Sequence, residues 1–139
     1  LGREGELFLR KILFILYVED QDKSTNFYSN VLAQQPNLYV PGMTEYLLSP
    51  ETALGLMPIH GIKKLLAETL PDPALAKGIP RSEFYWIVKN ATEYHCRALV
   101  HGAKELSPLQ ERSWGDCVAY SLDPDGHVLA FAEQSKSPS

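Results

Sequence analysis

The feature that most constrains the fold of this chain is a repeat between its two halves. The segment FILYVED at residues 14–20 matches FYWIVKN at residues 84–90, and the two segments start 70 positions apart in a chain of 139 residues. In each copy an apolar run ends in a valine, a polar pair follows, and a helical pattern begins. A repeat of this length indicates two similar supersecondary units that bury their apolar faces together.

The local patterns predict a strand, a helix and then two or three strands in each half. The expected fold class is therefore α+β, with two βαβββ modules whose curved mixed sheets together make a cleft. The expected strands are residues 12–18, 38–40, 45–49, 53–58, 83–88, 104–106, 117–122 and 127–133. The expected helices are 24–33, with Asp22 or Ser24 as its N-cap, 91–101, which Gly102 ends, and a short one at 62–69.

The same patterns divide the chain into a single domain with two short ends. Residues 1–10 are expected to form an N-terminal arm and residues 135–139 a tail. The domain then runs over residues 11–134, with module one at about 11–60, a linker at 61–80 and module two at about 81–134. Four prolines and glycines between residues 71 and 80 favour the linker, and Asp-Pro-Asp-Gly at 123–126 favours a hairpin turn.

Composition excludes several classes of partner. The net charge is −4 and no run of lysine and arginine exceeds two residues, so nucleic acid is not an expected partner. The apolar run 12–18 is too short to cross a membrane, and acidic residues rather than a cleavage site follow it. Cys96 and Cys117 form no zinc-type motif and are expected to be buried or half-buried thiols. These features favour a cytoplasmic protein with no membrane partner.

Two longer segments resemble one protein family. FILYVEDQDKSTNFYSNVL at residues 14–32 is similar to the opening of the glyoxalase-type module, and SWGDCVAYSLDPDGHVLAFAE at residues 113–133 is similar to its closing strands. The chain thus resembles the glyoxalase/bleomycin-resistance/dioxygenase superfamily, also called the vicinal-oxygen-chelate superfamily, over residues 11–134. The resemblance specifies the fold more than the activity, because one fold hosts many chemistries.

The resemblance also implies where a metal would bind. Metal-dependent members place one ligand on each of four strands, and the matching positions here are Leu13, Gly55, Glu83 and Ala130. Only Glu83 can bind a cation, whereas a stable catalytic site needs three or four protein ligands. No metal or other cofactor is therefore expected, and surface positions are expected for all four histidines.

Strand alternation indicates which residues face the expected cleft. The residues expected to line it are Leu13, Ile15, Tyr17, Gly55, Met57, Glu83, Tyr85, Trp114 and Ala130. Glu83 is either a polar handle for the ligand or a general base, or else a strand-end residue that is solvated or paired with Arg81 or another basic neighbour. Trp114 either stacks on a ligand or only caps the cleft or a dimer seam.

The main hypothesis is a metal-free small-molecule binding protein that sequesters an apolar or aromatic ligand, as the bleomycin-resistance branch does. The alternative is an enzyme, either a lactoylglutathione-lyase-like lyase or isomerase or a dioxygenase-type enzyme, with Glu83 as base or metal ligand. A third possibility is a structural dimer without a ligand. A homodimer is expected in each case, since half-open sheets leave apolar edges.

Overall fold

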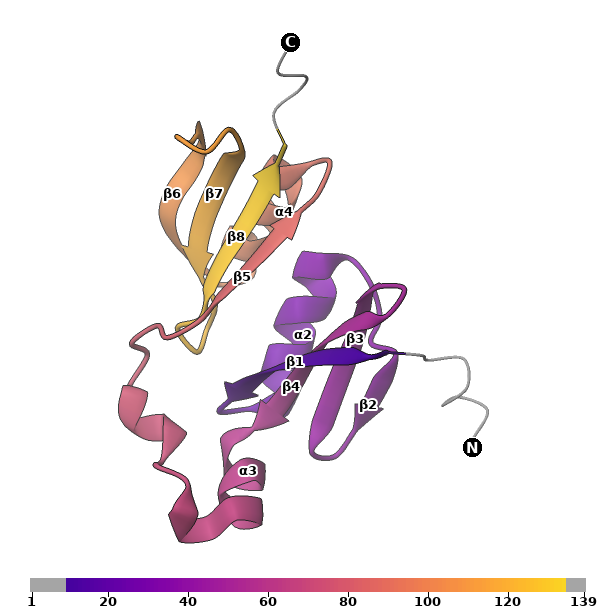
Figure 1. Ribbon diagram of the computed structural model, residues 1–139, viewed down its shortest axis with the longest axis vertical. Helices are drawn as coiled ribbons and strands as arrows, with labels where there is room; N and C mark the ends of the chain where they lie inside the picture. The colour runs from indigo at the N-terminus through magenta and orange to yellow at the C-terminus, as the bar shows by residue number, and fades with distance from the viewer. Residues whose placement is uncertain (1–9, 135–139) are drawn as a thin grey trace. The chain divides into compact units, whose positions relative to one another are not determined.

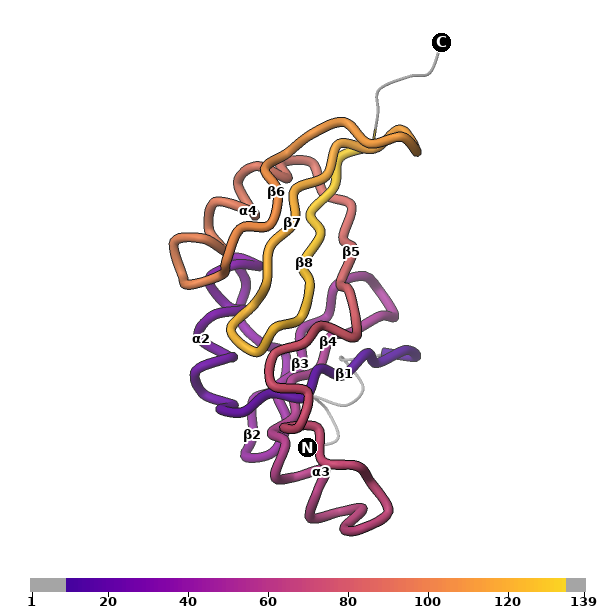
Figure 2. The backbone as a smooth tube through the Cα atoms, turned by 90° about the vertical axis from the view of Figure 1, so that its left-hand side faces the viewer, coloured from indigo at the N-terminus to yellow at the C-terminus, as the bar shows by residue number. Residues whose placement is uncertain are grey.

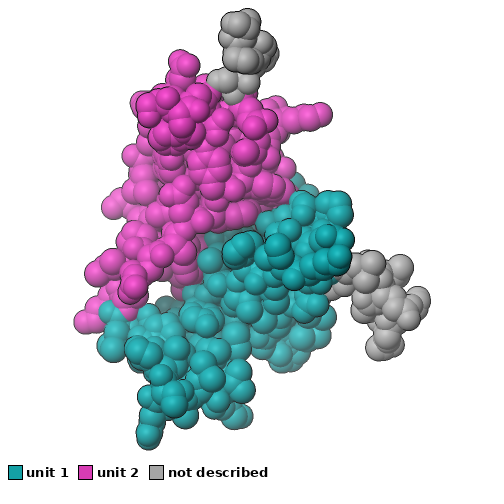
Figure 3. Space-filling model, viewed as in Figure 1, with its two compact units in different colours: residues 1–29, 33–75 teal, residues 30–32, 76–139 magenta. Residues whose placement is uncertain are grey.

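The computed structural model of the protein describes residues 10–134. The chain divides into two compact units, residues 1–29 with 33–75 and residues 30–32 with 76–139 (Figure 3). The predicted tail, 135–139, and the predicted arm before Arg10 lie outside the described residues. In the described part of the chain, no helix is long and apolar enough to cross a membrane.

Module one has the predicted order of strand, helix and three strands. Its elements are β1 (Ile12–Val18), α2 (Gln21–Leu32), β2 (Leu38–Val40), β3 (Met43–Ser49) and β4 (Thr52–Pro58) (Figure 1). The strands form a sheet in the order β1-β4-β3-β2. β1 runs parallel to β4, and the other two pairings are antiparallel, so the sheet is mixed as predicted.

Module two repeats this topology. Its elements are β5 (Glu83–Ile87), α4 (Ala91–Val100), β6 (Lys104–Glu111), β7 (Cys117–Leu122) and β8 (Val128–Glu133). Figure 2 shows its strands side by side in the order β5-β8-β7-β6. β5 is parallel to β8, as β1 is to β4. The two βαβββ modules predicted from the repeat are therefore confirmed, while the cleft stays a prediction.

The segment between the modules is more regular than the prediction of a linker. It contains α3 (Ile59–Leu66) and two short 3-10 helices, η1 (Ala67–Thr69) and η2 (Pro73–Ala76). The helix expected at 62–69 thus begins and ends three residues earlier. Ala67 ends it with a positive φ of 51°, and the rest of the predicted range continues as a 3-10 turn.

The start of α2 also differs from the prediction. Asp20, not Asp22 or Ser24, is the N-cap, and its Oδ1 accepts a hydrogen bond of 3.1 Å from the Lys23 amide. Asp22 instead lies in the first turn, where its negative charge interacts favourably with the helix dipole. The sequence correctly indicated that a helix begins near this point with a capping side chain. It did not identify which side chain, because three acidic or hydroxyl residues that can cap a helix lie within five positions.

β6 is longer than the predicted strand at 104–106. It continues to Glu111 through Pro108, which cannot donate a hydrogen bond to a neighbouring strand. β6 is the edge strand of its sheet, where proline is tolerated. Its pairing with β7 shifts register on both sides of Ser107, so the strand bends around the proline without ending.

In module one, α2 covers one face of the sheet. Thr25 Oγ1 lies 2.8 Å from Thr44 Oγ1, and Ser29 Oγ lies 2.8 Å from the Tyr46 hydroxyl. Thr44 and Tyr46 therefore face the helix, and alternation turns Glu45 to the opposite face. The helix-side core residues are fully or nearly fully buried, and they include Leu16, Val18, Phe27, Tyr28, Leu54 and Leu56.

In module two, aromatic side chains pack between the sheet and α4. Trp86 meets Tyr94 of the helix edge to face at 5.5 Å, and Tyr94 lies 5.3 Å from Phe131 of β8. Phe84 stacks on Trp86 at 5.8 Å. Phe84 and Trp86 thus face the helix as predicted. Alternation therefore turns Glu83, Tyr85 and Ile87 to the other face of the sheet.

Candidate functional site

The face of the module-two sheet that α4 does not cover has a floor of small apolar side chains. Ala130 of β8 pairs with Tyr85 on one side and with Tyr120 of β7 on the other, so two tyrosines flank one alanine. The next row along the sheet places Ala132 between Ile87 and Val118. Val118, Ala130 and Ala132 are completely buried, and both tyrosines pack against them. We call this surface the tyrosine face.

A chain of hydrogen bonds crosses the rim of the tyrosine face. Trp114 Nε1 donates to the Tyr85 hydroxyl at 2.9 Å, and that hydroxyl donates to Asp116 Oδ2 at 2.5 Å. Burial raises the pKa of Tyr85, and the bond to Asp116 raises it further, so the hydroxyl keeps its proton at neutral pH. Trp114 is 57% exposed although its indole nitrogen is bonded. The rim therefore presents an indole ring in a fixed orientation.

A tight turn between β6 and β7 carries these rim residues. The Arg112 amide donates to the Asp116 carbonyl at 2.8 Å, and the Gly115 amide donates to the Arg112 carbonyl at 3.0 Å. Gly115 has a φ of +103°, which a residue with a side chain rarely adopts. This backbone geometry fixes where Trp114, Asp116 and Arg112 leave the sheet.

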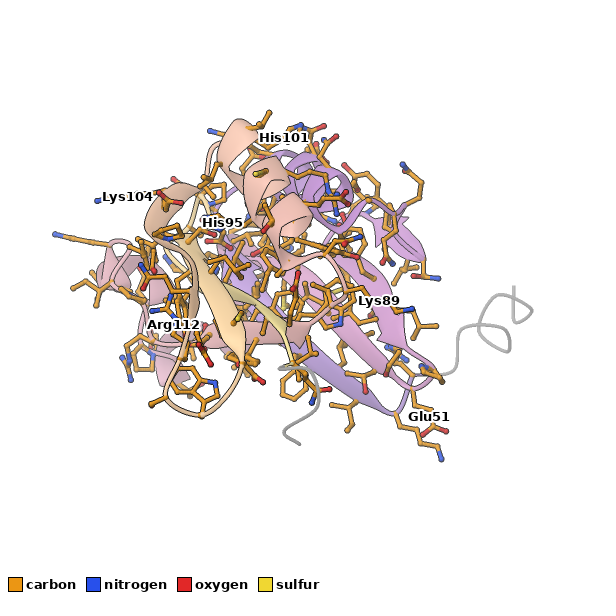
Figure 4. All side chains as sticks on the ribbon, turned by 90° about the horizontal axis from the view of Figure 1, so that it is seen from above. Glu51, Lys89, His95, His101, Lys104 and Arg112 are labelled. Atoms are coloured by element: carbon orange, nitrogen blue, oxygen red, sulfur yellow. The ribbon has the colours of Figure 1, made fainter. Side chains whose placement is uncertain are left out.

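Arg112, which is labelled in Figure 4, reaches back from this turn to the ring of Tyr120. Its guanidinium carbon lies 5.1 Å from the centre of the Tyr120 ring, within cation–π range. Burial raises the pKa of Tyr120, the charge of Glu83 raises it as well, and the charge of Arg112 opposes both effects. A cation and an anion thus act on the same tyrosine. Sequence reasoning missed Arg112, because its place depends on the shifted pairing of β6 and β7.

Glu83 occupies the first position of β5 and is exposed. This exposure agrees with the alternative of a solvated strand-end residue, and the role of Glu83 in binding stays a prediction. The residue does lie on the predicted side of the sheet, but strand ends leave room for solvent, and its register partner is the half-buried Val128. Its geometry suits a handle at the border of the tyrosine face better than a buried base.

The corresponding face of module one brings three predicted residues together. A methyl group added at Gly55 would lie 3.2 Å from Leu13 Cδ1, 3.2 Å from Met43 Sδ and 3.3 Å from Ile15 Cγ1. Leu13, Ile15 and Gly55 therefore share one face, and the neighbouring side chains already fill the space above the glycine. Tyr17 and Met57 are half-buried register partners farther along the same two strands.

This face of module one also holds a carboxylate that sequence reasoning missed. Glu45 is 2% exposed and pairs in register with Gly55. Arg10 compensates its charge, with Nε 2.8 Å from Glu45 Oε1. Alternation from Tyr46 would have placed Glu45 here, but only with the knowledge that Tyr46 faces α2. The ion pair joins a buried carboxylate of β3 to an exposed arginine just before β1.

The residues at the four inferred metal positions do not fit a metal. Leu13, Gly55 and Ala130 offer no side-chain donor, and Glu83 offers a single carboxylate. Among residues 10–134, no group of three or more histidine, cysteine, aspartate or glutamate side chains is arranged to hold a metal ion. A divalent cation bound by one carboxylate would lack the protein ligands that a stable site needs.

The prediction that all four histidines lie on the surface is wrong for His95. This residue is 5% exposed on α4, and its Nε2 lies 2.8 Å from Glu105 Oε2. The side chain faces the sheet, and Glu105 of β6 satisfies one of its nitrogens. The two cysteines are free thiols, and Cys96 is exposed rather than buried, since it lies on the outer side of α4.

Comparison with known proteins shows similarity at the level of structure. No protein-family model and no curated protein matches the sequence. A glyoxalase-related enzyme from Fulvimarina pelagi has a similar structure, with a TM-score of 0.74 and 20% identity over 90% of this chain and 88% of that one. A glyoxalase/bleomycin resistance protein/dioxygenase from Nocardioides has a TM-score of 0.71 and 17% identity over 92% and 86% of the two chains.

A third similar structure points to the same class. A glyoxalase/bleomycin resistance protein/dioxygenase family enzyme from Burkholderia phytofirmans has a TM-score of 0.69 and 17% identity, over 88% of this chain and 96% of that one. Together with the repeated topology, these similarities define an α+β protein of paired βαβββ modules. The chain has the glyoxalase/bleomycin-resistance fold, as its sequence resemblance implied.

Proposed function

We propose that the protein is a metal-free small-molecule binding protein, and that its tyrosine face holds an aromatic or apolar ligand. The observation that carries this proposal is the hydrogen-bonded chain Trp114–Tyr85–Asp116 beside a floor of buried alanine and valine. Aromatic rings of fixed orientation bind flat ligands at a low entropic cost. The apolar floor offers a surface that a ligand can cover without losing hydrogen bonds.

Glu83 supplies the polar handle in this proposal. It lies on the same side of the sheet as Tyr85, and its charge acts on Tyr120, so it stands at the border of the tyrosine face. A hydroxyl or amine of the ligand can donate to this carboxylate. The alternative of a glyoxalase-like lyase or isomerase with Glu83 as base gains no support from its exposure, because general bases of that kind are usually desolvated.

No metal takes part in the proposed binding, because three of the four inferred ligand positions carry no donor. Elemental analysis after dialysis against a weak chelator tests this part of the proposal. We expect less than stoichiometric zinc, nickel or iron, and ligand binding that dialysis leaves unchanged. A stoichiometric metal whose removal abolishes binding would refute it.

The two tryptophans provide a direct test of the binding surface, because Trp114 lies at the tyrosine face and Trp86 faces the helix. We suggest titration of 15N-labelled protein with 2-naphthol, which has a flat apolar body and one polar end. The indole N–H signal of Trp114 should shift with ligand concentration, and the signal of Trp86 should stay in place. A shift of Trp86 alone, or of neither signal, would refute the proposed site.

Two pairs of variants sharpen the test. Tyr85→Phe breaks the hydrogen-bonded chain and should weaken 2-naphthol binding, whereas Tyr94→Phe, on the helix side, should leave it unchanged. Glu83→Gln preserves shape and should weaken binding by about 1.5–3 kcal/mol, the size of a charged hydrogen bond. If calorimetry gives equal affinities for the wild type and Glu83→Gln, Glu83 is a solvated strand-end residue and the apolar face alone binds the ligand.

A further inference from the structure

The charge of Arg112 has no acidic partner in the described part of the chain. Its Nη2 donates to Ser107 Oγ at 2.7 Å, to the Val118 carbonyl at 2.7 Å and to the Pro108 carbonyl at 3.4 Å. These acceptors are neutral. Among residues 10–134, no carboxylate lies within ion-pair distance of this guanidinium. Neutral acceptors therefore hold the side chain in place, while its positive charge has no ion-pair partner among residues 10–134.

The hydrogen-bonding capacity of Arg112 is also incompletely used. Its Nε is buried and has no partner, and Nη1 makes only a long contact of 3.4 Å with Gln110 Oε1. A half-buried guanidinium is costly unless an anion or several good acceptors offset the loss of water. Nη1 is the group that an added acceptor can satisfy.

Arg97 offers an internal comparison in the same module. It too lies over a tyrosine, with its guanidinium carbon 4.5 Å from the centre of the Tyr94 ring. Unlike Arg112, it has an acidic neighbour, because Nη1 lies 3.8 Å from Glu93 Oε1. The missing carboxylate is thus a property of the tyrosine face and not of every arginine stacked on a tyrosine in this module.

We propose that Arg112 binds a carboxylate of the ligand, so that the ligands of this protein are aromatic carboxylic acids. This inference rests on the proposed function, because it assigns a chemical class to the ligand of the tyrosine face. The guanidinium stands ready for a charge-assisted hydrogen bond, and its position is fixed before the ligand arrives. Glu83, at the start of β5, repels a carboxylate, so the ligand is oriented with its carboxylate at Arg112.

A matched pair of probes isolates the charge. 2-Naphthoate and 2-naphthamide have nearly the same shape, but only the first is an anion. On the wild type we expect 2-naphthoate to bind at least about tenfold more tightly, as for a charged hydrogen bond. The affinity is read from the shift of the Trp114 indole N–H signal. In Arg112→Gln the two affinities should become equal within about twofold, while Arg97→Gln should keep the wild-type ratio.

The outcomes separate this inference from the proposed function. If both probes shift the Trp114 signal with equal affinity on the wild type, or if Arg112→Gln keeps the ratio, the carboxylate assignment is wrong and the binding face stands. If neither probe moves the signal, the proposed function itself fails. If Arg112→Gln does not fold, the ratio of the wild-type affinities for the two probes is measured instead at low and at high salt. A ratio that falls with salt supports the assignment, and one that does not change overturns it.

Discussion

The turn that joins β7 to β8 depends on one buried carboxylate, and its removal should destabilise module two. Asp123 is 4% exposed, and its Oδ1 accepts hydrogen bonds from the amides of Asp125 at 2.9 Å and His127 at 2.8 Å. Its Oδ2 lies 2.9 Å from His127 Nδ1. Asp123→Ala would leave two turn amides and one imidazole without these acceptors.

The magnitude follows from the number and type of these bonds. Each hydrogen bond to a charged group contributes about 1.5–3 kcal/mol, and water replaces part of the loss at a half-buried turn. We therefore expect Asp123→Ala to lower the free energy of unfolding by about 3 kcal/mol. Asp123→Asn keeps an acceptor for the amides and loses only the charge, so it should cost about half as much.

The part of the effect that involves His127 should depend on pH. Burial of the ring lowers the pKa of His127, but the hydrogen bond and charge of Asp123, with the charge of Asp125, outweigh burial and raise the pKa above 6.5. The folded state therefore holds the proton more tightly than the unfolded state. The stabilisation is fully present below pH 6.5 and is lost as the pH rises through the folded-state pKa.

Urea denaturation monitored by tryptophan fluorescence measures the unfolding of module two, because Trp86 and Trp114 both lie in that module. The stability difference between the wild type and Asp123→Asn should be larger at about pH 5.5 than at about pH 9. His127→Gln should remove this pH dependence. If Asp123→Ala costs less than about 0.5 kcal/mol, or the difference does not change with pH, the reasoning about the turn is refuted.

Three further predictions concern the same turn, the core of module one and the assembly of the protein. Gly126→Ala should destabilise far more than Gly102→Ala: both glycines have a positive φ, but an added Cβ would lie 2.4 Å from the Gly78 carbonyl oxygen at residue 126 and meet nothing within 4 Å at residue 102. Comparable losses in urea denaturation would contradict the clash. Tyr46→Phe should cost about 1–2 kcal/mol, because the hydroxyl bonds Ser29 and the Thr25 carbonyl, and it should remove a tyrosine whose pKa burial raises to about 12 in spectroscopic titration. The control is Tyr39→Phe, which removes the hydroxyl of an exposed tyrosine and should lower the stability less. Finally, we expect a homodimer, since Ile12 and Phe14 are exposed on the edge strand β1, and a monomeric mass by light scattering would count against it.

The fold was predictable because its determinants are local and repeated. The valine at or directly after the end of each first strand and the Asp-Pro-Asp-Gly turn indicate element type and order without knowledge of distant contacts. The boundaries of helices were less predictable where several residues could serve as the N-cap, as Asp20 and Asp22 could at the start of α2. β6 continued through Pro108 because it is an edge strand, which only the sheet order reveals.

Only the part of the candidate site that follows from strand alternation could be predicted from the sequence. Alternation placed Tyr85 and Ala130 on one face of the sheet, since it needs nothing beyond the strand itself. Arg112 and Glu45 were missed because their positions depend on pairing between strands, which single-strand patterns do not contain. Trp114 was expected either to stack on a ligand or to cap the cleft or a dimer seam, but its bond to Tyr85 joins residues 29 positions apart and has no sequence signal.

The two modules share a topology but differ on the sheet faces that their helices do not cover, and this difference favours module two in the proposed function. In module one, Leu13, Met43 and Ile15 fill the space above Gly55, and the buried charge of Glu45 is compensated by Arg10. In module two, Tyr85 stands where the repeat has Ile15, and its hydroxyl orients Trp114 at the rim of the face. The cation of that face has no acidic partner among the described residues. A surface that satisfies its own charge needs no ligand, whereas one that keeps a fixed cation beside fixed aromatic rings is preorganised for an anion with a flat apolar body.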